Sequence, residues 1–598
     1  MEKERRKEDG MEKWMVAAKK ADFESWARQF GISPVLARII RNRDITEPEE
    51  VGKFLGGTLA DCYSPWLLKG MEEAVGLLRN NMADNVKIRV IGDYDVDGIC
   101  SSYILTRALR DMGGRVDTAI PHRIRDGYGL NDALIEEAHA DGVGLIVTCD
   151  NGIAAQPQIA RARELGMQVV VTDHHEVPYV EEEGRRIQQL PPAEAVIDPK
   201  QEGCGYPWQG ICGAVVAYKL VSALGERMAF RGLEALKEEL LPFAALATVC
   251  DVMELKDENR ILVREGLRRF GACENPGLRA LLEVNGLEPA AVSAYHLGFV
   301  LGPCLNATGR LDTARRALEL LESRDRTEAM TAARELKDLN DSRKNMTLQG
   351  VEQAVEQLEA AGGLPDPVMV LYLPQVHESL AGIIAGRIRE RYHHPVFVLT
   401  RGEEGVKGSG RSIETYHMYD AMSRVKQYFT KYGGHRMAAG LSMKEEDVEP
   451  LRQALNAGCG LTPEDFVPRV HIDVPMPLSF ANMELARELE KLEPYGAGNP
   501  RPLFAQKGVI LKRGRRIGAK QNFARFTVEA EGVCRELLFF GDLEAFCRSL
   551  EERHGPGSAE RLFAAGGGYE MGIAYQLGIN RYRGREELQF TIQNFYFV

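Results

Sequence analysis

The pattern of apolar and polar positions divides the chain into regions with different predicted secondary structure. Residues 15–80 carry apolar positions at helical spacing. From residue 86, short apolar runs at 86–92, 143–149 and 167–172 alternate with helical stretches such as 98–112, and residues 195–197 form a fourth, shorter candidate strand. Apolar strands that alternate with helices are typical of a parallel sheet covered on both faces. This part of the chain is therefore predicted to be an α/β domain.

The second half repeats this alternation once and then changes character. Residues 213–350 are mostly helical in pattern, and the charged stretch 327–361 predicts a long connecting helix. A second α/β pattern then has strands at 368–372 and 395–399 around a helix near 380–392. From residue 470, short strands such as 508–511, 523–529 and 536–540 are separated by Gly and charged turns, which predicts a small barrel or sandwich.

Together these patterns predict two α/β domains joined by a long helix and followed by a β-rich domain. The predicted bounds are 1–80 for an N-terminal helical region, 81–325, 326–362 for the connecting helix, 363–460, and 465–598.

Composition narrows the class of protein. The chain has 598 residues and a net charge of −12, with 27% charged and 44% apolar residues, as in ordinary globular proteins. No apolar run is long enough for a membrane span, and the charged N-terminus does not read as a secretory signal. Eleven scattered cysteines without a CxxC spacing predict reduced thiols in a cytoplasmic protein. The acidic balance leaves room for a local basic path to nucleic acid.

Three acidic motifs follow three of the predicted strands. Asp93, Asp95 and Asp97 stand at alternate positions after the first, Asp150 follows the second, and Asp173-His174-His175 follows the third. Because ligands bind outside the carboxyl ends of parallel strands, the motifs are expected to converge at one edge. A solvated acidic turn or helix caps are the alternatives. A calcium loop is excluded, because Ile104 stands where its last ligand, Glu, is required.

The mixture of carboxylates and imidazoles predicts the kind of metal. An excess of carboxylates favours Mn²⁺ or Mg²⁺. Five or six ligands exceed one tetrahedral site, so a pair of ions with a shared carboxylate is the simplest hypothesis. A single structural metal is the alternative.

The motifs DYDVDG (93–98) and TDHH (172–175) resemble the DHH phosphoesterase superfamily, and within it the bacterial single-strand-specific exonucleases. The resemblance spans nearly the whole chain. Residues 248–253 with 258–260 are similar to a fourth motif, and 305–311 to an asparagine–arginine loop. Further on, similarity to a second catalytic lobe, called DHHA1, rests on 377–387, 408–412 (GSGRS) and 433–440 (GGHRMAAG).

The resemblance implies a set of site residues. Asp150 would bridge the two ions, His175 would face the phosphate, and Asp173 would orient its neighbours. The implied metal ligands are Asp93, Asp95, Asp97, Asp150, His174 and Asp251, and the implied catalytic residues are Asp95, Asp97, Asp150, His174, His175 and Asp251. The implied contacts to the substrate phosphate are Asn306, Arg310, Ser409, Arg411 and His435.

The residues of the second lobe support a phosphate site on their own chemistry. Gly-Ser-Gly-Arg offers backbone N–H groups, a hydroxyl and a guanidinium, which suit a phosphate cradle with a bidentate clamp. A tight turn is the alternative for this motif, and a structural histidine is the alternative for His435. Two positions depart from the family pattern: Cys304 stands where Arg is frequent, and Asp198 where Asn is frequent.

A basic stretch lies in the β-rich region. Residues 501–528 contain eight Lys and Arg and no Asp or Glu, with three interspersed phenylalanines. Clustered cations and aromatics on a β module are typical of a single-strand platform, although core packing is the favoured role for the phenylalanines. The resemblance implies an OB-fold here, and the candidate nucleic-acid contacts are Lys512, Arg513, Arg515, Arg516 and Lys520.

The resemblance implies a metal-dependent exonuclease that degrades single-stranded DNA from its 5′ end, in DNA repair and recombination. Its implied partners are single-stranded DNA and, as protein candidates, a single-strand-binding protein or a RecQ-type helicase. No membrane contact is expected, because no apolar run is long enough. A monomer is expected, because the two lobes already form one site. One alternative is a phosphodiesterase of short oligonucleotides or cyclic dinucleotides, and another is a non-catalytic nucleic-acid-binding relative.

Overall fold

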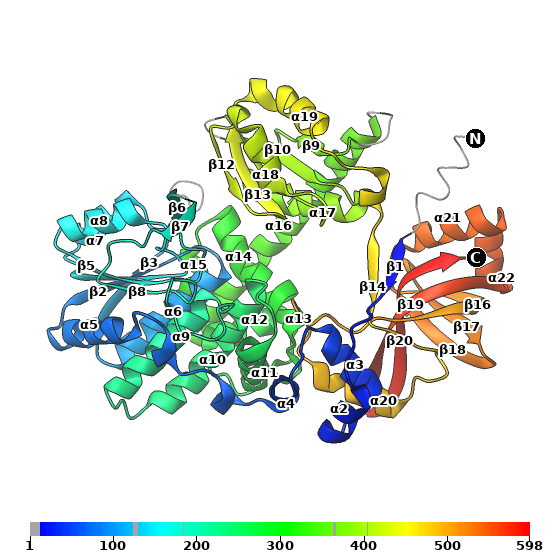
Figure 1. The fold of residues 1–598 in the computed structure, drawn as a ribbon, viewed down its shortest axis with the longest axis horizontal. Coiled ribbons are helices and arrows are strands. Elements are labelled where there is room, and N and C mark those ends of the chain that lie inside the picture. Colours follow the sequence, from blue (N-terminus) through cyan, green and yellow to red (C-terminus); the bar gives the residue numbers. More distant parts are fainter. Residues whose placement is uncertain (1–11, 123–128, 183, 361, 363–365, 403–404) are drawn as a thin grey trace. The chain divides into compact units, whose positions relative to one another are not determined.

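The computed structural model describes residues 12–122, 129–182, 184–360, 362, 366–402 and 405–598 (Figure 1). The chain forms two compact units. One unit comprises Met1–Cys62, Glu254–Arg264 and Pro468–Val598, and the other comprises Tyr63–Met253 and Glu265–Val467. The short segment 254–264 thus belongs to the smaller unit, although the residues before and after it in the sequence belong to the larger one.

The first sheet of the larger unit is parallel and confirms the predicted α/β fold. Its spatial order is β3 (Arg115–Ala119), β2 (Lys87–Gly92), β4 (Leu145–Cys149), β5 (Gln168–Thr172) and β8 (Ala195–Ile197). Four of these strands were predicted, and β3 was not. Strand β3 lies on one side of β2 and β4 on the other, so the order reverses next to β2. The carboxyl ends of β2 and β4 therefore flank a topological switch point, where open α/β sheets bind ligands.

Helices surround this sheet and continue beyond it. Those near the sheet are α5 (Met71–Ala83), α6 (Val96–Asp111), α7 (Asp132–Ala140), α8 (Gln156–Glu164), α9 (Gly213–Arg227) and α10 (Leu233–Cys250). They are followed by α11 (Asp257–Phe270), α12 (Pro276–Val284), α13 (Ala294–His296), the π-helical turn η4 (Leu297–Leu301), α14 (Gly302–Leu311) and α15 (Arg315–Glu322). A hairpin of β6 (Tyr179–Glu182) and β7 (Arg185–Gln188) lies between β5 and β8 in sequence. The predicted connecting helix is α16 (Arg326–Ala360).

The second sheet has the order β12 (Lys431–Gly434), β13 (Ala438–Met443), β11 (Gly405–Arg411), β10 (Val396–Gly402) and β9 (Met369–Tyr372). Helix α17 (Ala381–Tyr392) packs on β10 and β11, and α18 (Met418–Arg424) and α19 (Val448–Ala457) complete this domain. The interpretation of GSGR as a backbone cradle or a tight turn is wrong. Strand β11 pairs with β10 on one side and β13 on the other, so its backbone is occupied by the sheet.

The smaller unit is built on a closed barrel, which confirms the predicted barrel at the C-terminus. Strands β16 (Phe504–Ile517), β17 (Phe523–Ala530), β18 (Val533–Phe539), β20 (Arg585–Phe597) and β19 (Tyr569–Tyr582) follow one another, and β19 pairs back with β16. Helices α20 (Met483–Leu489), α21 (Leu543–His554) and α22 (Ser558–Ala564) accompany it. The three phenylalanines of the basic stretch differ in burial. Phe504 and Phe526 are fully buried, in agreement with the predicted core role, and Phe523 is half-buried.

The N-terminal segment is not purely helical as predicted. Before α2 (Phe23–Phe30), α3 (Pro34–Asn42) and α4 (Pro48–Gly56), strand β1 (Lys13–Val16) pairs in parallel with β14 (Arg469–Ile472). A buried ion pair joins the same two regions, because Arg43 contacts Asp473 at 2.6 Å and both side chains are almost fully enclosed. Within the part of the chain that the structure describes, no helix is long and apolar enough to cross a membrane.

Candidate active site

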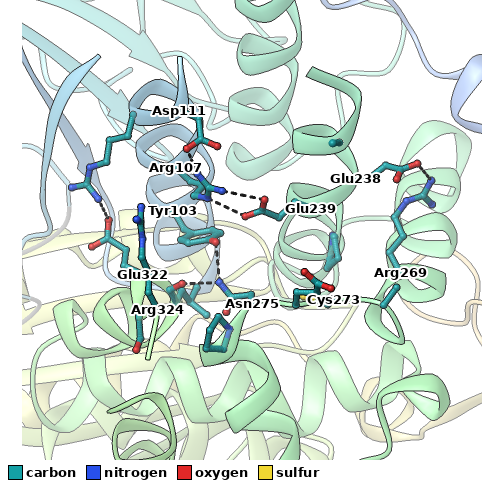
Figure 2. Close-up of a pocket in the computed structure, with 18 residues that line it drawn as sticks. Tyr103, Arg107, Asp111, Glu238, Glu239, Arg269, Cys273, Asn275, Glu322 and Arg324 are labelled. Carbon is teal, nitrogen blue, oxygen red and sulfur yellow. Dashed lines mark hydrogen bonds and ion pairs between the residues drawn. The ribbon is translucent and has the colours of Figure 1, made fainter. Parts of the chain in front are cut away.

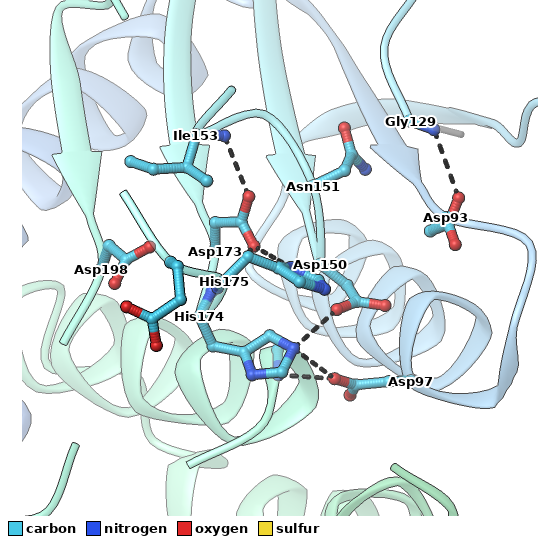
Figure 3. Close-up of polar contacts among 12 residues, drawn as sticks. Asp93, Asp97, Gly129, Asp150, Asn151, Ile153, Asp173, His174, His175 and Asp198 are labelled. Atoms are coloured by element: carbon cyan, nitrogen blue, oxygen red, sulfur yellow. Dashed lines mark hydrogen bonds and ion pairs between the residues drawn. The ribbon is translucent and has the colours of Figure 1, made fainter. Parts of the chain in front are cut away.

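The acidic motifs meet at the carboxyl edge of the first sheet. Asp93 follows β2, Asp150 follows β4, and Asp173, His174 and His175 follow β5, so adjacent strands deliver them to one place. Figure 3 shows the side chains of Asp97, Asp150 and His174 pointing toward one another below this edge. The switch point of the sheet and the acidic cluster therefore coincide.

Backbone N–H groups at the N-terminal ends of two helices hold two of the carboxylates, those of Asp95 and Asp97. Asp95 caps α6, because its Oδ1 accepts a hydrogen bond from the N–H of Gly98 at 3.1 Å. Asp97 accepts the N–H groups of Gly213 and Ala214, both at 2.7 Å, at the start of α9. The positive end of that helix thus holds the Asp97 carboxylate in one orientation. The role of α9 was not predicted from the sequence.

Asp150 occupies a crowded and strained position. Its φ of 60° lies in the left-handed region, which a residue other than Gly adopts at a cost and often at functional sites. A Cβ added to Gly213 would lie 2.8 Å from the Cβ of Asp150, so only glycine fits at the start of α9. The backbone and the neighbouring helix together define where the Asp150 carboxylate points.

His174 connects the cluster. Its Nε2 lies 3.0 Å from Asp150 Oδ1, 3.5 Å from Asp97 Oδ2 and 3.7 Å from Asp251 Oδ2. Asp251 reaches the site from the C-terminal end of α10. The buried Nδ1 of His174 has no hydrogen-bond partner among the residues that the structure describes. The ring nitrogen that faces the three carboxylates is Nε2, which is the atom placed to coordinate a metal ion.

Three overlapping groups of side chains have the spacing of metal ligands. They are Asp93, Asp95 and Asp150; Asp97, His174 and Asp251; and Asp150, His174 and His175. In each group the ligand atoms lie within 4.8 Å of one another. Asp150 belongs to two groups, as a bridging ligand would. His175 was expected to face the phosphate, yet its position is also within reach of a metal.

The electrostatics of the cluster favour a cation. Burial and the neighbouring carboxylates, chiefly Asp97, raise the pKa of Asp95 and Asp150 and bring the pKa of Asp251 to about 8. Burial lowers the pKa of His174, which keeps the ring neutral and able to coordinate. Carboxylates and a neutral imidazole match the donors that Mn²⁺ and Mg²⁺ take, so the residues fit such ions.

Asp173 and His175 form a separate ion pair beside the cluster. Burial alone would raise the pKa of Asp173, but the hydrogen bond and charge of His175 and the N–H of Ile153 lower it. Burial opposes the charge of His175, yet its Nδ1 lies 2.7 Å from Asp173 Oδ1, and this pair raises the histidine pKa to about 9. His175 is therefore a half-exposed cation at the rim of the site.

The two positions that depart from the family pattern lie outside the cluster. Asp198 is buried after β8, where burial raises its pKa to about 8, and its Oδ1 accepts the N–H of Lys200. Cys304 is fully buried, and Asn340 of α16 donates to its sulfur at 3.4 Å. Cys304 thus serves helix packing.

Three of the five predicted phosphate contacts gather near the start of α17. Arg310 of α14 donates to the carbonyl of Ser379, which lies just before that helix, at 2.8 Å. A Cβ on Gly382 would lie 3.0 Å from Arg411 Nη2 and 3.4 Å from Ser409 Oγ, so these side chains lie against its first turn. Asn306 lies one turn before Arg310 on α14. His435 is exposed at the β12–β13 turn, and no contact recorded for the described residues links it to the others.

Arg411 carries an unbalanced charge. Its Nη1 donates a hydrogen bond to the carbonyl of Gly410 at 2.8 Å, and no carboxylate among the described residues pairs with it. Burial, with a smaller effect of Arg389, lowers its pKa. A partly buried guanidinium without an anionic partner is costly, and an anion such as phosphate would balance it.

Basic residues of β16 and β17 line a groove on the barrel. Arg513, Arg515 and Arg516 come from β16 and Arg525 from β17, and the ring of Phe563 lies 4.9 Å from the guanidinium of Arg516. Glu536 also lines the groove and pairs with Arg525 at 3.2 Å. Lys512 is already paired with Glu529 at 2.9 Å. Arg513, Arg515 and Lys520 are exposed and have no recorded carboxylate partner in the described chain.

A separate cavity of about 720 Å³ lies at the other end of α6 (Figure 2). Three of its four arginines pair with carboxylates: Arg107 with Glu239 at 3.0 Å, Arg110 with Glu322 at 2.8 Å and Arg269 with Glu238 at 3.5 Å. Arg107 follows Asp97 by ten residues, roughly 15 Å along the helix axis. Because most of its charges are paired internally, this cavity is a weaker candidate than the acidic edge.

Comparison with known families matches the domains described above. The DHH family N-terminal domain matches residues 87–248, the DHHA1 domain matches residues 366–460, and the RecJ OB domain matches residues 472–594.

Similar proteins match over most of their length. The chain is 35% identical to the single-stranded-DNA-specific exonuclease RecJ of Escherichia coli, covering 94% of this chain and 96% of the relative. It is 33% identical to RecJ of Bacillus subtilis, over 96% of this chain and 69% of the relative. The crystal structure of RecJ with Mn²⁺ from Thermus thermophilus superposes with a TM-score of 0.78 at 28% identity, covering 98% of this chain and 79% of that one. A structure of the same protein with Mg²⁺ also matches, with a TM-score of 0.74 and 27% identity over 98% of this chain and 78% of that one.

Proposed function

Because this chain belongs to the RecJ family of single-stranded-DNA-specific exonucleases, we propose that it removes nucleotides from the 5′ end of single-stranded DNA by metal-dependent hydrolysis. The observation that carries the proposal is the convergence of three ligand groups at the switch point of the first sheet. An unbalanced, partly buried arginine in the same unit of the chain, Arg411, supports phosphate as the ligand.

The proposed ligands of two Mn²⁺ or Mg²⁺ ions are Asp93, Asp95, Asp97, Asp150, His174 and Asp251. When bound, such a pair supplies hydroxide near neutral pH and offsets negative charge on the phosphoryl group. The chain's own contribution is orientation. The N–H groups of α9 fix Asp97, the left-handed backbone fixes Asp150, and burial keeps His174 neutral.

Other side chains hold the strand and manage charge. Arg411 and Ser409 are proposed to bind the phosphate at the start of α17, where backbone N–H groups also favour an anion. Arg310, tethered to Ser379, is proposed to guide the next phosphate, with Asn306 beside it and His435 as an outer contact. His175, kept protonated by its ion pair with Asp173, is proposed to donate a hydrogen bond to the scissile phosphate.

We further propose that the barrel tracks the strand. Arg513, Arg515, Arg516 and Lys520 would bind phosphates, whereas Lys512 would contribute less because of Glu529. The family supports a role in DNA repair and recombination. A single-strand-binding protein or a RecQ-type helicase is proposed as a protein partner, and a monomer as the working state. A cytoplasmic location is proposed because the cysteines of the described chain form no disulfide.

The test is a time course with Mn²⁺ on a long single strand labelled at either end, beside the same sequence as a duplex. We expect the 5′ label to appear at once as mononucleotide while the duplex survives. Early release of the 3′ label would refute the polarity. Cleavage confined to dinucleotides or cyclic dinucleotides would refute the substrate class and leave the basic groove unexplained.

A further inference from the structure

Two large aromatic side chains lie exposed on one face of the helix that leads into α14. Tyr295 is 64% exposed and Phe299 is 69% exposed. They are four residues apart, and their rings stack with centroids 5.1 Å apart and an interplanar angle of 24°. Their neighbours Ala294, Leu297 and Leu301 are buried, so the helix presents its aromatic side to solvent. A preformed exposed stack of this kind is a surface on which a flat ring can add.

This aromatic pair lies on an element that packs against the end of α10. The thiol of Cys250 donates to the carbonyl of Leu297 at 3.5 Å. A Cβ on Gly298 would lie 3.4 Å from Val249, and one on Gly302 would lie 2.3 Å from the Cys250 sulfur. Asp251, which reaches the candidate metal cluster, follows Cys250 directly. The helix that carries the aromatic pair therefore packs against the segment that ends at Asp251.

The residue after Asp251 is also unusual. Val252 has a φ of 57° and is 72% exposed. The N–H of Val252 donates to the carbonyl of Val249 at 3.2 Å, and the N–H of Met253 donates to the carbonyl of Thr248 at 3.1 Å. These two hydrogen bonds form the Schellman motif that ends many helices, and the position of Val252 in that motif is normally glycine. A β-branched residue in the left-handed region is strained. An exposed valine that strains the backbone gives nothing to the core, which points to a role at the surface.

We propose that Tyr295, Phe299 and Val252 form an apolar platform that stacks the bases of the single strand as it passes the metal centre. The inference rests on the proposed function and deepens it by assigning a base-contacting subsite. Aromatic faces accept any base, so the platform would add affinity without sequence preference. Bases that are paired in a duplex cannot lie on such a surface, so the platform would also favour single strands.

Steady-state cleavage of a thymidine 20-mer with Mn²⁺ tests the platform in the full chain. For the double variant Tyr295→Ala with Phe299→Ala, we expect KM to rise about 5-fold to 150-fold, since stacking of one base contributes about 1–3 kcal/mol. We expect kcat at saturation to change less than KM, and the melting temperature to stay the same. Phe480→Ala, which removes an aromatic ring that is 56% exposed in the other unit, is the control and should leave KM unchanged.

Val252→Gly separates binding from stability most sharply. Glycine suits the left-handed backbone, so the melting temperature should stay equal or rise. Glycine removes the isopropyl group, so KM should nevertheless rise, by about fourfold for each methylene-sized part of that group that contacts a base. A variant that is more stable and binds the strand less well has no explanation in a purely structural role.

Oligonucleotides with a single abasic site locate the subsite. In the wild type, one abasic position should raise KM, and at that position the double variant should show no further loss. The proposal is overturned if the abasic profile is the same in both proteins. It is also overturned if the aromatic variants lower the melting temperature and leave KM unchanged, because the pair would then be a packing surface. If the wild type did not cleave the intact strand at all, the proposed function itself would have failed.

Discussion

Gly213→Ala tests how the start of α9 organises the carboxylates. The added methyl would lie 2.8 Å from Asp150 Cβ and 3.1 Å from its Oδ1. Carbon atoms prefer a separation of about 3.5–4.0 Å, so the two groups must part by roughly 1 Å. The same backbone N–H holds Asp97 at 2.7 Å, so one shift displaces two proposed ligands. A misplacement of about 1 Å can cost about 10²-fold in rate.

We therefore expect kcat of the Gly213→Ala enzyme to fall about 100-fold at saturating Mn²⁺, with far-UV circular dichroism and strand affinity retained. Gly76→Ala is the matched control, because nothing lies within 4 Å of a Cβ at that position in α5. Wild-type kcat in Gly213→Ala would refute the idea that close packing of α9 positions the acidic cluster.

Three further outcomes are expected from other parts of the molecule. In the metal-free protein, the pKa of Asp251 is raised from 3.8 to about 8, so between these pH values the folded state keeps a proton on Asp251 that the unfolded state releases. The melting temperature in EDTA should therefore fall as pH rises from about 4 to 8, and added Mn²⁺ should reverse this loss. Asp473→Ala leaves Arg43 buried without its partner and should lower the unfolding free energy in urea by about 3–5 kcal/mol. Arg513→Ala with Arg515→Ala should reduce the slope of log binding constant against log salt by about 1.4, or about 0.7 for each phosphate contact.

Controls for these outcomes lie in the same chain. Lys19→Ala breaks an exposed pair with Asp44 and should cost about 1 kcal/mol or less, unlike the buried pair. Lys512→Ala should change the salt slope less than either arginine, because Glu529 already neutralises it. A melting temperature that rises with pH in EDTA, or an unchanged salt slope in the arginine variant, would contradict the reasoning.

The parts of the fold predicted from sequence are those whose pattern is local. Strands β2, β4 and β5 are continuous apolar runs, and α16 is long and charged. Strand β3 was missed because its sequence, RVDTA, alternates with polar residues at a sheet edge. Strand β1 could not be read from its sequence, because four residues pair with a segment more than 450 positions away.

Glycines misled the interpretation of the second lobe. Gly408 and Gly410 suggested a turn, but they lie in a central strand where a Cβ would lie 2.4 Å from Leu399 and from Met418 respectively. Close packing, not a turn, requires glycine there. Which side chains face a phosphate depends on such neighbours, and the sequence does not record them.

At the active site, the carboxylate cluster was predictable from the sequence, and the backbone groups that hold its side chains in place were not. Carboxylates after consecutive strands must share an edge, so the cluster followed from pattern. The N–H groups that hold Asp97 come from α9, more than a hundred residues later, and the only signal was the glycine before an apolar helix. Long-range packing of this kind leaves little trace in a single sequence.

The most direct test of the acidic edge as the catalytic centre is the Asp150→Ala variant, in parallel assays of cleavage and of strand binding. Asp150 is shared by two ligand groups, so its loss should remove the charge stabilisation that the ions supply, several kcal/mol, and lower kcat by about 10³-fold or more. Strand affinity, which the arginines carry in this account, should remain near that of the wild type. Cleavage that persists near the wild-type rate would contradict the assignment of the acidic edge as the catalytic centre.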